Sequence, residues 1–358
     1  MMRNLALLSL VLVSLVGCAT QAVDRLDPAP NAQDDAGATN PNLGGQKPNS
    51  KPSETPATST VFYAHTDKEL FIVDPTKSDL PMQSAGLFDC VGTGKQAKSI
   101  TDLAVDKTGK IYLVATPASG KKSIAFLDVK IAGGAVQCAG KGVSLNTEAT
   151  LMGATFAPEG TVLPSAEALV VADVSGSLYQ VDTNSADTTL LGNFGIVPAA
   201  DAQGNAYENK GTKFQISGDI VFMAGNGTPL GFATVRDCPP SGSGSCNRTD
   251  TLVEIDMSKL RAGNTGSVVK KVSGQVLKAA SCADTNESYG SMFGIAAFGD
   301  QIFGFARTTV NKKAVAQVVR IDNSTGSACL VADQSALTNA GFSGAGVTTS
   351  VQVSVPVK

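Results

Sequence analysis

The chain has 358 residues, of which 42% are hydrophobic, 16% charged and 5% aromatic, and its formal net charge is −3. This balance argues against a nucleic-acid-binding protein, which would carry an excess of clustered Lys and Arg. The single His excludes sites built from two or more histidines, including most zinc sites. The 37 Gly residues and the low share of charged residues favour strands and turns over helices.

The first seventeen residues have the pattern of a secretory signal. A short, weakly positive start that contains Arg3 is followed by a nearly continuous apolar run from Leu5 to Val16. This run is too short to cross a membrane, because a helix needs roughly 20 apolar residues to span the hydrocarbon core. A short apolar stretch behind a basic start is instead typical of a cleaved export signal, so we interpret residues 1–17 as a signal peptide.

The apolar run ends in Leu15-Val16-Gly17-Cys18. These four residues resemble the lipobox of bacterial lipoproteins. The resemblance implies cleavage after Gly17 and a lipid on Cys18, which becomes the mature N-terminus. Two or more acyl chains anchor a protein stably, since each buried CH₂ contributes about 0.8 kcal/mol. The next residue is Ala19 and not the inner-membrane-retaining Asp, which implies a cell-envelope protein in the outer membrane if the host has two membranes.

Residues 18–59 differ sharply in composition from the rest of the chain. Six of the sixteen prolines fall in this segment, among Asn, Gly, Ser and Thr, and large apolar side chains are scarce. Such a segment cannot bury enough surface to offset the entropy of ordering it. We therefore predict a disordered tether with a reach on the order of 35 Å, which would hold a folded body clear of the membrane.

From residue 60 onward, short runs rich in Val, Ile, Phe and Thr alternate with clusters of Gly, Asp, Asn and Ser. This pattern predicts an all-β domain over residues 60–358. Five of the apolar runs end in an Asp before a turn, namely Asp74, Asp128, Asp182, Asp256 and Asp322. Because an Asp side chain can accept backbone N–H bonds from the turn that follows it, we interpret all five as structural rather than catalytic.

A second unit, made of an apolar strand, a Gly turn and another strand, precedes most of these runs and is clearest at Ile100–Val114. A period near 50 residues built from four short strands is typical of a β-propeller. Ile100–Val114 also resembles the NHL- and YVTN-type propeller repeats, which implies an architecture and no activity. We predict five blades, although the length also allows six, and we assign the excess to insertions at residues 196–212 and 236–250.

Each end of the domain has the pattern of an incomplete blade, and the strand that one end lacks is present at the other. Residues 61–73 form a first repeat without an inner strand, and residues 343–349 have the pattern of an inner strand without followers. Together they would complete one blade and remove an open sheet edge. We therefore predict a ring that is closed by the N- and C-terminal strands.

Six cysteines follow Cys18, and an even number behind a secretory signal indicates an oxidising compartment and disulfides. One pair flanks a short Pro-, Gly- and Ser-rich segment, and the other four cysteines lie near outermost strands of neighbouring blades. The predicted pairs are Cys238–Cys246, Cys90–Cys138 and Cys282–Cys329. Zinc is the alternative, but the chain has no CxxC pair to support it.

Two classes of function remain open. We predict no cofactor and no metal for either class, and we assign no catalytic residue. The first is a monomeric binding module that holds a protein, a glycan or a small ligand, without nucleic acid, and reaches the membrane through the lipid on Cys18. The second is an extracytoplasmic hydrolase, similar to glycoside hydrolases, with carboxylates in a central funnel. Asp102, Asp219 and Glu287 are the candidates for a ligand site, because each is predicted at the start of an inner strand of a different blade.

Overall fold

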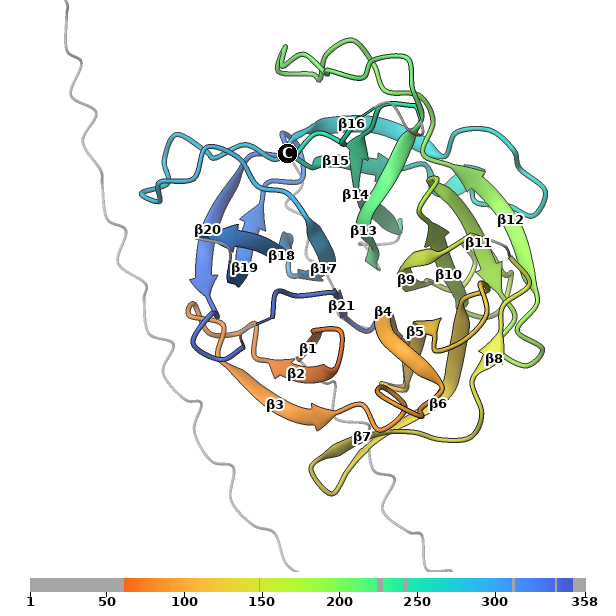
Figure 1. Cartoon of the computed structure of the whole chain (residues 1–358). Helices are drawn as coiled ribbons and strands as arrows, with labels where there is room; N and C mark the ends of the chain where they lie inside the picture. Colours follow the sequence, from red (N-terminus) through yellow and green to blue (C-terminus); the bar gives the residue numbers. More distant parts are fainter. Residues whose placement is uncertain are drawn as a thin grey trace, which may run out of the picture. The chain divides into compact units, whose positions relative to one another are not determined.

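The computed structural model describes residues 61–147, 149–223, 228–240, 244–310, 313–338 and 340–349. The predicted signal peptide, Cys18 and the tether over residues 18–59 lie outside the described residues. The described chain forms five antiparallel sheets arranged as the blades of a propeller (Figure 1). The all-β class and the blade number of five are confirmed.

Blades one and two are the first two of the five blades. The strands of blade one, from the axis outward, are β21 (Gly344–Gly346), β1 (Phe62–His65), β2 (Glu69–Val73) and β3 (Met82–Leu87). Those of blade two are β4 (Ala97–Val105), β5 (Ile111–Pro117), β6 (Ile124–Ala132) and β7 (Ala135–Cys138), with β8 (Val143–Ser144) also paired to β6.

Blades three to five complete the ring with four strands each. Blade three has β9 (Leu151–Ala157), β10 (Ala168–Asp173), β11 (Ser177–Val181) and β12 (Thr188–Asn193). Blade four has β13 (Phe214–Met223), β14 (Leu230–Asp237), β15 (Thr251–Ile255) and β16 (Val269–Gln275), with the short 3₁₀ helix η1 (Met257–Lys259) after β15. Blade five has β17 (Met292–Phe298), β18 (Gln301–Val310), β19 (Lys313–Ile321) and β20 (Ala328–Asp333).

The ring closes through the two ends of the domain, as predicted. β21 supplies the inner strand of blade one and pairs with β1 in antiparallel register, with Ala345 opposite Ala64. The C-terminal strand therefore covers an edge of β1 that would otherwise be open to solvent. Beyond β21 the chain continues to the next blade, where Thr348 forms a parallel bridge with Val105.

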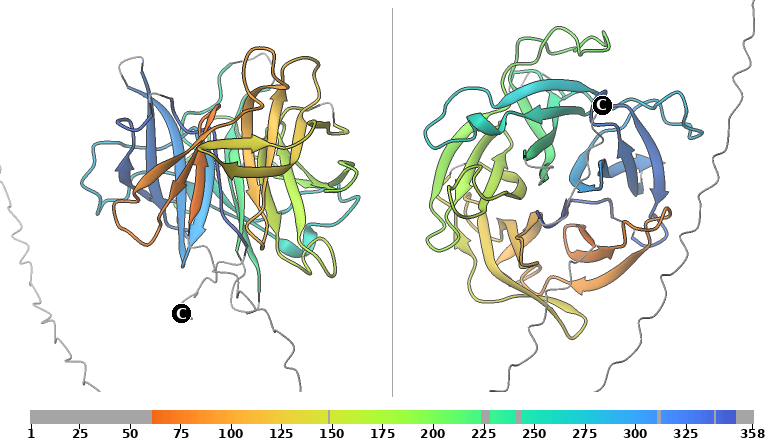
Figure 2. Two further views of the ribbon diagram at one scale, coloured as in Figure 1. Left: turned by 90° about the horizontal axis from the view of Figure 1, so that it is seen from below. Right: turned by 180° about the vertical axis from the view of Figure 1, so that it is seen from behind.

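The five inner strands define two faces of the molecule (Figure 2, left). We call the face where they begin the upper face and the face where they end the lower face. β1 runs antiparallel to the inner strand β21, so Val61 precedes it at the lower face. Thr348 and Thr349 follow the end of β21 at the same face. Both ends of the described domain therefore lie on the lower face.

Four of the five repeated Asp residues cap turns, as the sequence indicated. For example, the Oδ1 atom of Asp182 accepts N–H bonds from Asn184 and Ser185 at 2.7 and 3.2 Å. Asp74, Asp256 and Asp322 accept the equivalent bonds. Asp128 is the exception, because β6 continues to Ala132 and leaves Asp128 within a strand instead of before a turn.

Neighbouring blades are joined at their outer edges by short parallel bridges and disulfides. Phe88 pairs in parallel with Val136, and Lys278 pairs with Ala328. The disulfides Cys90–Cys138 and Cys282–Cys329 lie beside these two bridges, and Cys238–Cys246 closes the segment between β14 and β15. These are the three pairs predicted. The described residues of the segments 196–212 and 236–250 form no sixth blade, and Arg236 and Asp237 end β14.

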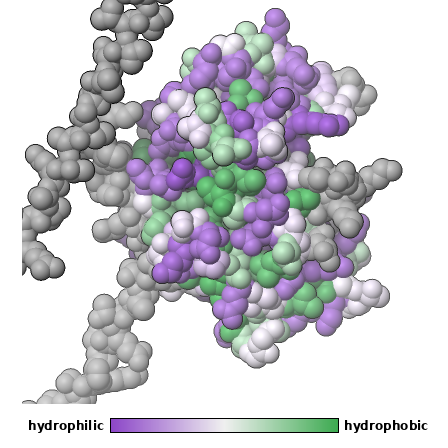
Figure 3. Space-filling model, turned by 90° about the vertical axis from the view of Figure 1, so that its left-hand side faces the viewer, coloured by the Kyte–Doolittle hydropathy of each residue, from purple (hydrophilic) through white to green (hydrophobic). Residues whose placement is uncertain are grey.

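Apolar side chains fill the space between the blades. Phe62 of blade one packs against Phe303 of blade five, with ring centroids 5.6 Å apart, and Phe305 packs edge-on against Phe342. The core is thus distributed between the sheets around the axis. On the outside, Figure 3 shows polar residues over much of the side where these blades meet, around a smaller apolar area.

Candidate functional site

A cavity of about 260 Å³ opens on the upper face at the propeller axis, and we call it the axial pocket. Its wall comes from the first residues of inner strands and from the loops and strand ends beside them. The lining residues are Asp67, Ser99, Ile100, Thr101, Thr116, Met152, Phe293, Arg307 and Ser343. Residues from four blades that are far apart in the sequence therefore meet at one place.

An ion pair lies at the wall of the axial pocket. Nη2 of Arg307 lies 2.7 Å from Oδ1 of Asp67, and the two side chains are 32% and 46% exposed. Ser343 donates its hydroxyl to the same Oδ1 atom, and Nε of Arg307 donates to the carbonyl of Phe342 at 3.2 Å. Burial acts to raise the pKa of Asp67, but the hydrogen bonds from Ser343 and Arg307 outweigh it and hold the pKa below its ordinary value. Asp67 is therefore ionised at neutral pH.

Glycines close the axis directly beneath the pocket. Gly153, Gly218, Gly294 and Gly344 each lie on, or begin, a different inner strand and face the next one. A Cβ atom at Gly218 would lie 2.1 Å from Cα of Phe293, and one at Gly294 would lie 2.4 Å from the backbone N of Ala345. Only glycine permits this approach, so the inner strands meet and the pocket has a closed floor.

The fifth inner strand, β4, carries Asp102 at the position that follows the pocket residue Thr101. Asp102 is fully buried, and its Oδ2 accepts the N–H of Ala154 in blade three at 2.6 Å. Asp219 is also fully buried and accepts the N–H groups of Ile220 and Ile295 at 2.6 and 2.9 Å. Each carboxyl group therefore links its own inner strand to that of the next blade.

Asp102 and Asp219 also contact each other, and both differ from ordinary surface carboxyls. Burial raises the pKa of Asp102 well above its usual value, and the neighbouring Asp219 raises it further. Burial likewise raises the pKa of Asp219, to about 8. Because two adjacent buried carboxylates repel each other, the pair retains a proton at neutral pH.

The single histidine belongs to this buried group. Nδ1 of His65 lies 2.8 Å from the carbonyl of Thr66, and Nε2 lies 3.7 Å from Oδ1 of Asp102. Burial lowers the pKa of His65 to about 4, so the ring is neutral at pH 7. The contact with the Thr66 carbonyl assigns the ring proton to Nδ1 and leaves the Nε2 lone pair toward Asp102.

The structure does not gather the three predicted ligand-site residues at one place. Asp102 and Asp219 meet at the axis, but they lie beneath the pocket floor and not in an open funnel. Glu287 is exposed in the segment between β16 and β17, and its backbone carbonyl accepts the N–H of Lys278. The inner strand β17 begins only at Met292, which is why Glu287 does not reach the axis.

The residues that line the axial pocket were missed at the sequence level. Asp67 lies in the turn between β1 and β2, and Phe293 has the pattern of an ordinary apolar residue of strand β17. Arg307 alone could have been recognised as a candidate, because it is a charged residue that directly follows the buried run Ile302–Ala306 in β18. Its partners lie in other blades, and no local pattern predicts them.

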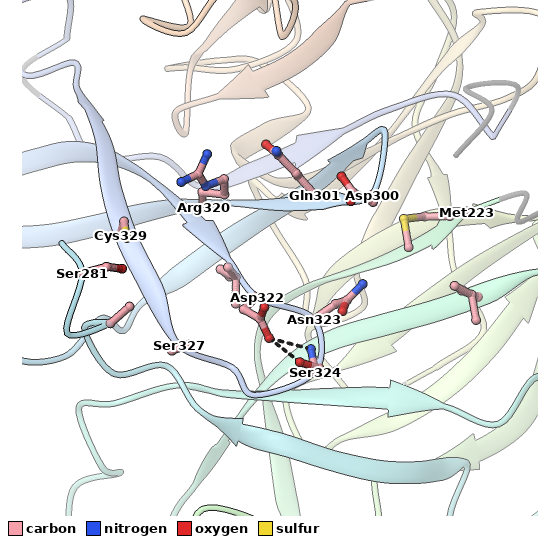
Figure 4. A pocket seen from close by; sticks show the side chains of 13 residues that line it. Met223, Ser281, Asp300, Gln301, Arg320, Asp322, Asn323, Ser324, Ser327 and Cys329 are labelled. Atoms are coloured by element: carbon pink, nitrogen blue, oxygen red, sulfur yellow. Dashed lines mark hydrogen bonds between the residues drawn. The ribbon is translucent and has the colours of Figure 1, made fainter. Parts of the chain in front are cut away.

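A larger cavity of about 690 Å³ lies between blades four and five on the lower face (Figure 4). Asp300, Gln301 and Arg320 line it beside the turn after β19. The carboxylate of Asp322 is already engaged there, because its Oδ1 accepts bonds from the N–H and the hydroxyl of Ser324. Asp322 and Ser324, which form part of this wall, therefore have a structural role in the turn.

One group of potential metal ligands occurs in the part of the chain that the structure describes. Asp89, Cys90 and Cys138 have ligand atoms within 4.8 Å of one another. Both thiols form a disulfide, and Oδ1 of Asp89 accepts the N–H of Cys138 at 2.9 Å. In this oxidised form the three residues connect blades one and two.

No known protein family matches the chain, and no curated protein sequence matches it. Among solved structures, the chain is similar to the PilY1 C-terminal domain of Pseudomonas aeruginosa, with 12% identity, a TM-score of 0.33, and coverage of 73% of this chain and 66% of that one. An endo-arabinase from Bacteroides thetaiotaomicron matches with 9% identity and a TM-score of 0.36 over 75% of this chain and 93% of the other. PorZ of Porphyromonas gingivalis matches with 10% identity and a TM-score of 0.25 over 74% and 31%.

Similarity at this level says nothing about what the chain binds. Among the described residues, no helix has the length and apolar character needed to cross a membrane.

Proposed function

We propose that the protein is a lipid-anchored envelope protein whose propeller is a binding module, with the axial pocket as its ligand site. One observation supports this above the others: the pocket opens on the upper face, whereas both ends of the described domain lie on the lower face. A tether that joins Cys18 to Val61 would therefore approach the face opposite the pocket. In this arrangement the pocket faces away from the membrane.

The charges of the lower face agree with this orientation. Its described turns hold more acidic than basic side chains. The acidic ones are Asp74, Asp79, Asp106, Glu159, Glu167, Asp182, Asp187, Asp256, Asp300 and Asp322, and the basic ones are Lys77, Lys107, Lys110, Lys259 and Arg261. An acidic surface is repelled by anionic lipid headgroups, so we expect this face not to adhere to the membrane.

The hydrolase alternative has less support from the geometry. Asp102 and Asp219 are fully buried below the glycine floor and accept backbone N–H bonds, and Glu287 is exposed elsewhere. A general acid and base must reach the substrate within hydrogen-bond distance. The binding module is therefore the better proposal.

The anchor is tested by Cys18→Ala in the producing bacterium. We expect the wild-type protein in the membrane fraction with a lipid-modified N-terminus, and the variant in the soluble fraction without that added mass. Thr20→Ala, two residues further along, is the matched control and should remain in the membrane fraction. A Cys18→Ala protein that stays membrane-bound at the wild-type mature mass would overturn the anchor.

The binding module is tested by filling the axial pocket. Thr116→Trp places a large side chain in the pocket wall, and Lys77→Trp places the same side chain on the lower face. We expect a component of an envelope extract, fractionated into glycans, peptides and small molecules, to raise the melting temperature of the wild type and of Lys77→Trp but not of Thr116→Trp. Equal shifts for all three proteins, or no shift for any of them, would contradict a ligand site at the pocket.

A further inference from the structure

We propose that the axial pocket binds one neutral sugar ring, either as a free hexose or as the terminal unit of a glycan. This inference rests on the proposed function, because it takes the axial pocket as the ligand site. It concerns the chemistry of the ligand, which follows from the charge, the hydrogen-bonding groups and the size of the pocket.

The charges around the pocket are balanced. The guanidinium of Arg307 is paired with the ionised carboxylate of Asp67 at 2.7 Å. A second guanidinium, that of Arg236, lies 5.8 Å from the ring centroid of Phe293 and donates to the hydroxyl of Ser217, which in turn donates to the carboxyl of the buried Asp250. An ionic ligand would thus meet both signs of charge at short range, which favours a neutral ligand.

Several hydrogen-bonding atoms of the pocket have no partner among the described residues. They are Oδ2 of Asp67, Nη1 of Arg307, and the hydroxyls of Ser99 and Thr116. The carboxylate oxygen only accepts, the guanidinium only donates, and the two hydroxyls do both. Hydroxyl groups on a ligand, each of them a donor and an acceptor, match this mixed set better than a carboxylate or an ammonium group does.

The remaining wall is apolar. Ile100 is buried, whereas Met152 and Phe293 are half-buried and line the pocket. The ring of Phe293 is held in place by Arg307, whose guanidinium lies 5.5 Å from the ring centroid. The C–H side of a sugar ring can pack against such a surface while its hydroxyls face the polar atoms, even without Trp.

The dimensions favour a single ring. A volume of about 260 Å³ lies below the roughly 300–1,000 Å³ of sites that enclose drug-sized ligands. The glycine floor prevents a longer ligand from passing along the axis. Any further units of a glycan would therefore extend from the upper face into solvent.

The test uses the full chain purified in detergent, with glucose, galactose and mannose as neutral probes and glucuronate and glucosamine as charged probes, each measured by ligand-observed NMR. We expect at least one neutral hexose to bind, and its charged counterparts to bind about tenfold more weakly or not at all. An oligosaccharide that ends in the binding hexose should bind as well, and it distinguishes a glycan end from a free sugar. Tighter binding of a charged probe would overturn the proposal.

A double variant, Ser99→Ala with Thr116→Val, removes two hydroxyls that make no hydrogen bond in the described structure, so it should fold normally. We expect it to weaken hexose binding about tenfold, since two neutral hydrogen bonds are lost. Thr265→Val, an exposed residue before β16, is the control and should bind like the wild type. Unchanged affinity in the double variant would place the sugar elsewhere and overturn the proposal.

The proposed function and the sugar proposal can fail separately. If no hexose binds while another extract component raises the melting temperature in a Thr116→Trp-sensitive manner, the binding module stands and the sugar proposal falls. If neither hexoses nor extract components act on the pocket, both fall.

Discussion

The carboxyl group of Asp219 is buried at the centre of the molecule, and its protonation is therefore coupled to folding. Its pKa is raised by burial from 3.8 to about 8. A raised carboxyl pKa stabilises the fold at low pH, and the contribution is lost as the pH rises through the folded pKa. His65 acts in the opposite sense, because burial lowers its pKa from 6.5 to about 4 and stability rises across that interval. Above pH 6.5 the carboxyl effect therefore remains without compensation from His65.

The first prediction concerns Asp219→Asn. Ile220 and Ile295 donate to different oxygens of Asp219, so the single amide oxygen keeps only one of these two bonds, and the side chain no longer titrates. Between pH 6.5 and 8 we expect the free energy of unfolding of the wild type to fall with pH by up to about 1.4 kcal/mol per unit for one proton, and that of the variant to fall less. Urea unfolding at several pH values measures both slopes.

The control for this prediction is Asp300→Asn, a change of the same kind at an exposed position on the lower face. Its pH slope should equal that of the wild type. Should Asp219→Asn keep the wild-type slope as well, Asp219 would not be the source of the pH dependence.

The second prediction tests the glycine floor. A Cβ at Gly218 would lie 2.1 Å from Cα of Phe293, and a backbone atom cannot move aside as a flexible side chain can. We expect Gly218→Ala to lower the free energy of unfolding by about 3 kcal/mol or more. Gly266→Ala is the matched control, because that glycine is exposed and the new methyl would meet only Asn264, at 3.4 Å. A Gly218→Ala protein as stable as the control would show that the inner strands do not touch.

At the scale of elements, the closing strand β21 is short but completes a whole blade. Ala345 is buried and opposite Ala64, and Gly344 lies beside the buried His65 and Asp102. Removal of β21 would expose the edge of β1 and also open the axis next to these polar side chains. Both changes affect groups that are fully buried in the closed ring.

The third prediction is that deletion of residues 344–358 abolishes cooperative unfolding of the domain, because blade one loses its inner strand. A chain that ends at Thr349 keeps β21 and is the control for shortening as such. Circular dichroism during heating distinguishes the two. If the 344–358 deletion melts like the control, ring closure by β21 does not stabilise the fold.

Strands could be predicted from the sequence because they depend on local patterns, and blade number, closure and disulfide pairs because these patterns repeat along the chain. Alternation and turn residues mark the strands, and the repeat places Cys90 near Cys138 in adjacent blades. Asp128 shows the limit of such patterns, since β6 extends past it through pairing with β7. The length of a strand depends on its partner as well as on its own residues.

At the scale of the whole molecule, the site could not be predicted, because it exists only after the ring has closed. Asp102 and Asp219 were expected at inner strands and are found there, but their burial results from glycines in neighbouring blades. Asp67 and Arg307, which form the wall of the axial pocket, are 240 residues apart in the sequence. Nothing near either residue indicates the other.

The last prediction concerns the boundary between residues 18–59 and the propeller. Residues 18–59 lack the apolar side chains needed for a core, whereas the propeller is closed by paired strands and three disulfides. Limited proteolysis of membranes that carry the wild-type protein should therefore release one resistant fragment that begins near Thr60. Mass spectrometry of the released material identifies its N-terminus, and the soluble Cys18→Ala protein should yield the same fragment. A fragment that begins near residue 30, or two separate resistant fragments, would show that part of residues 18–59 is folded and that the pocket is not held at the end of a flexible tether.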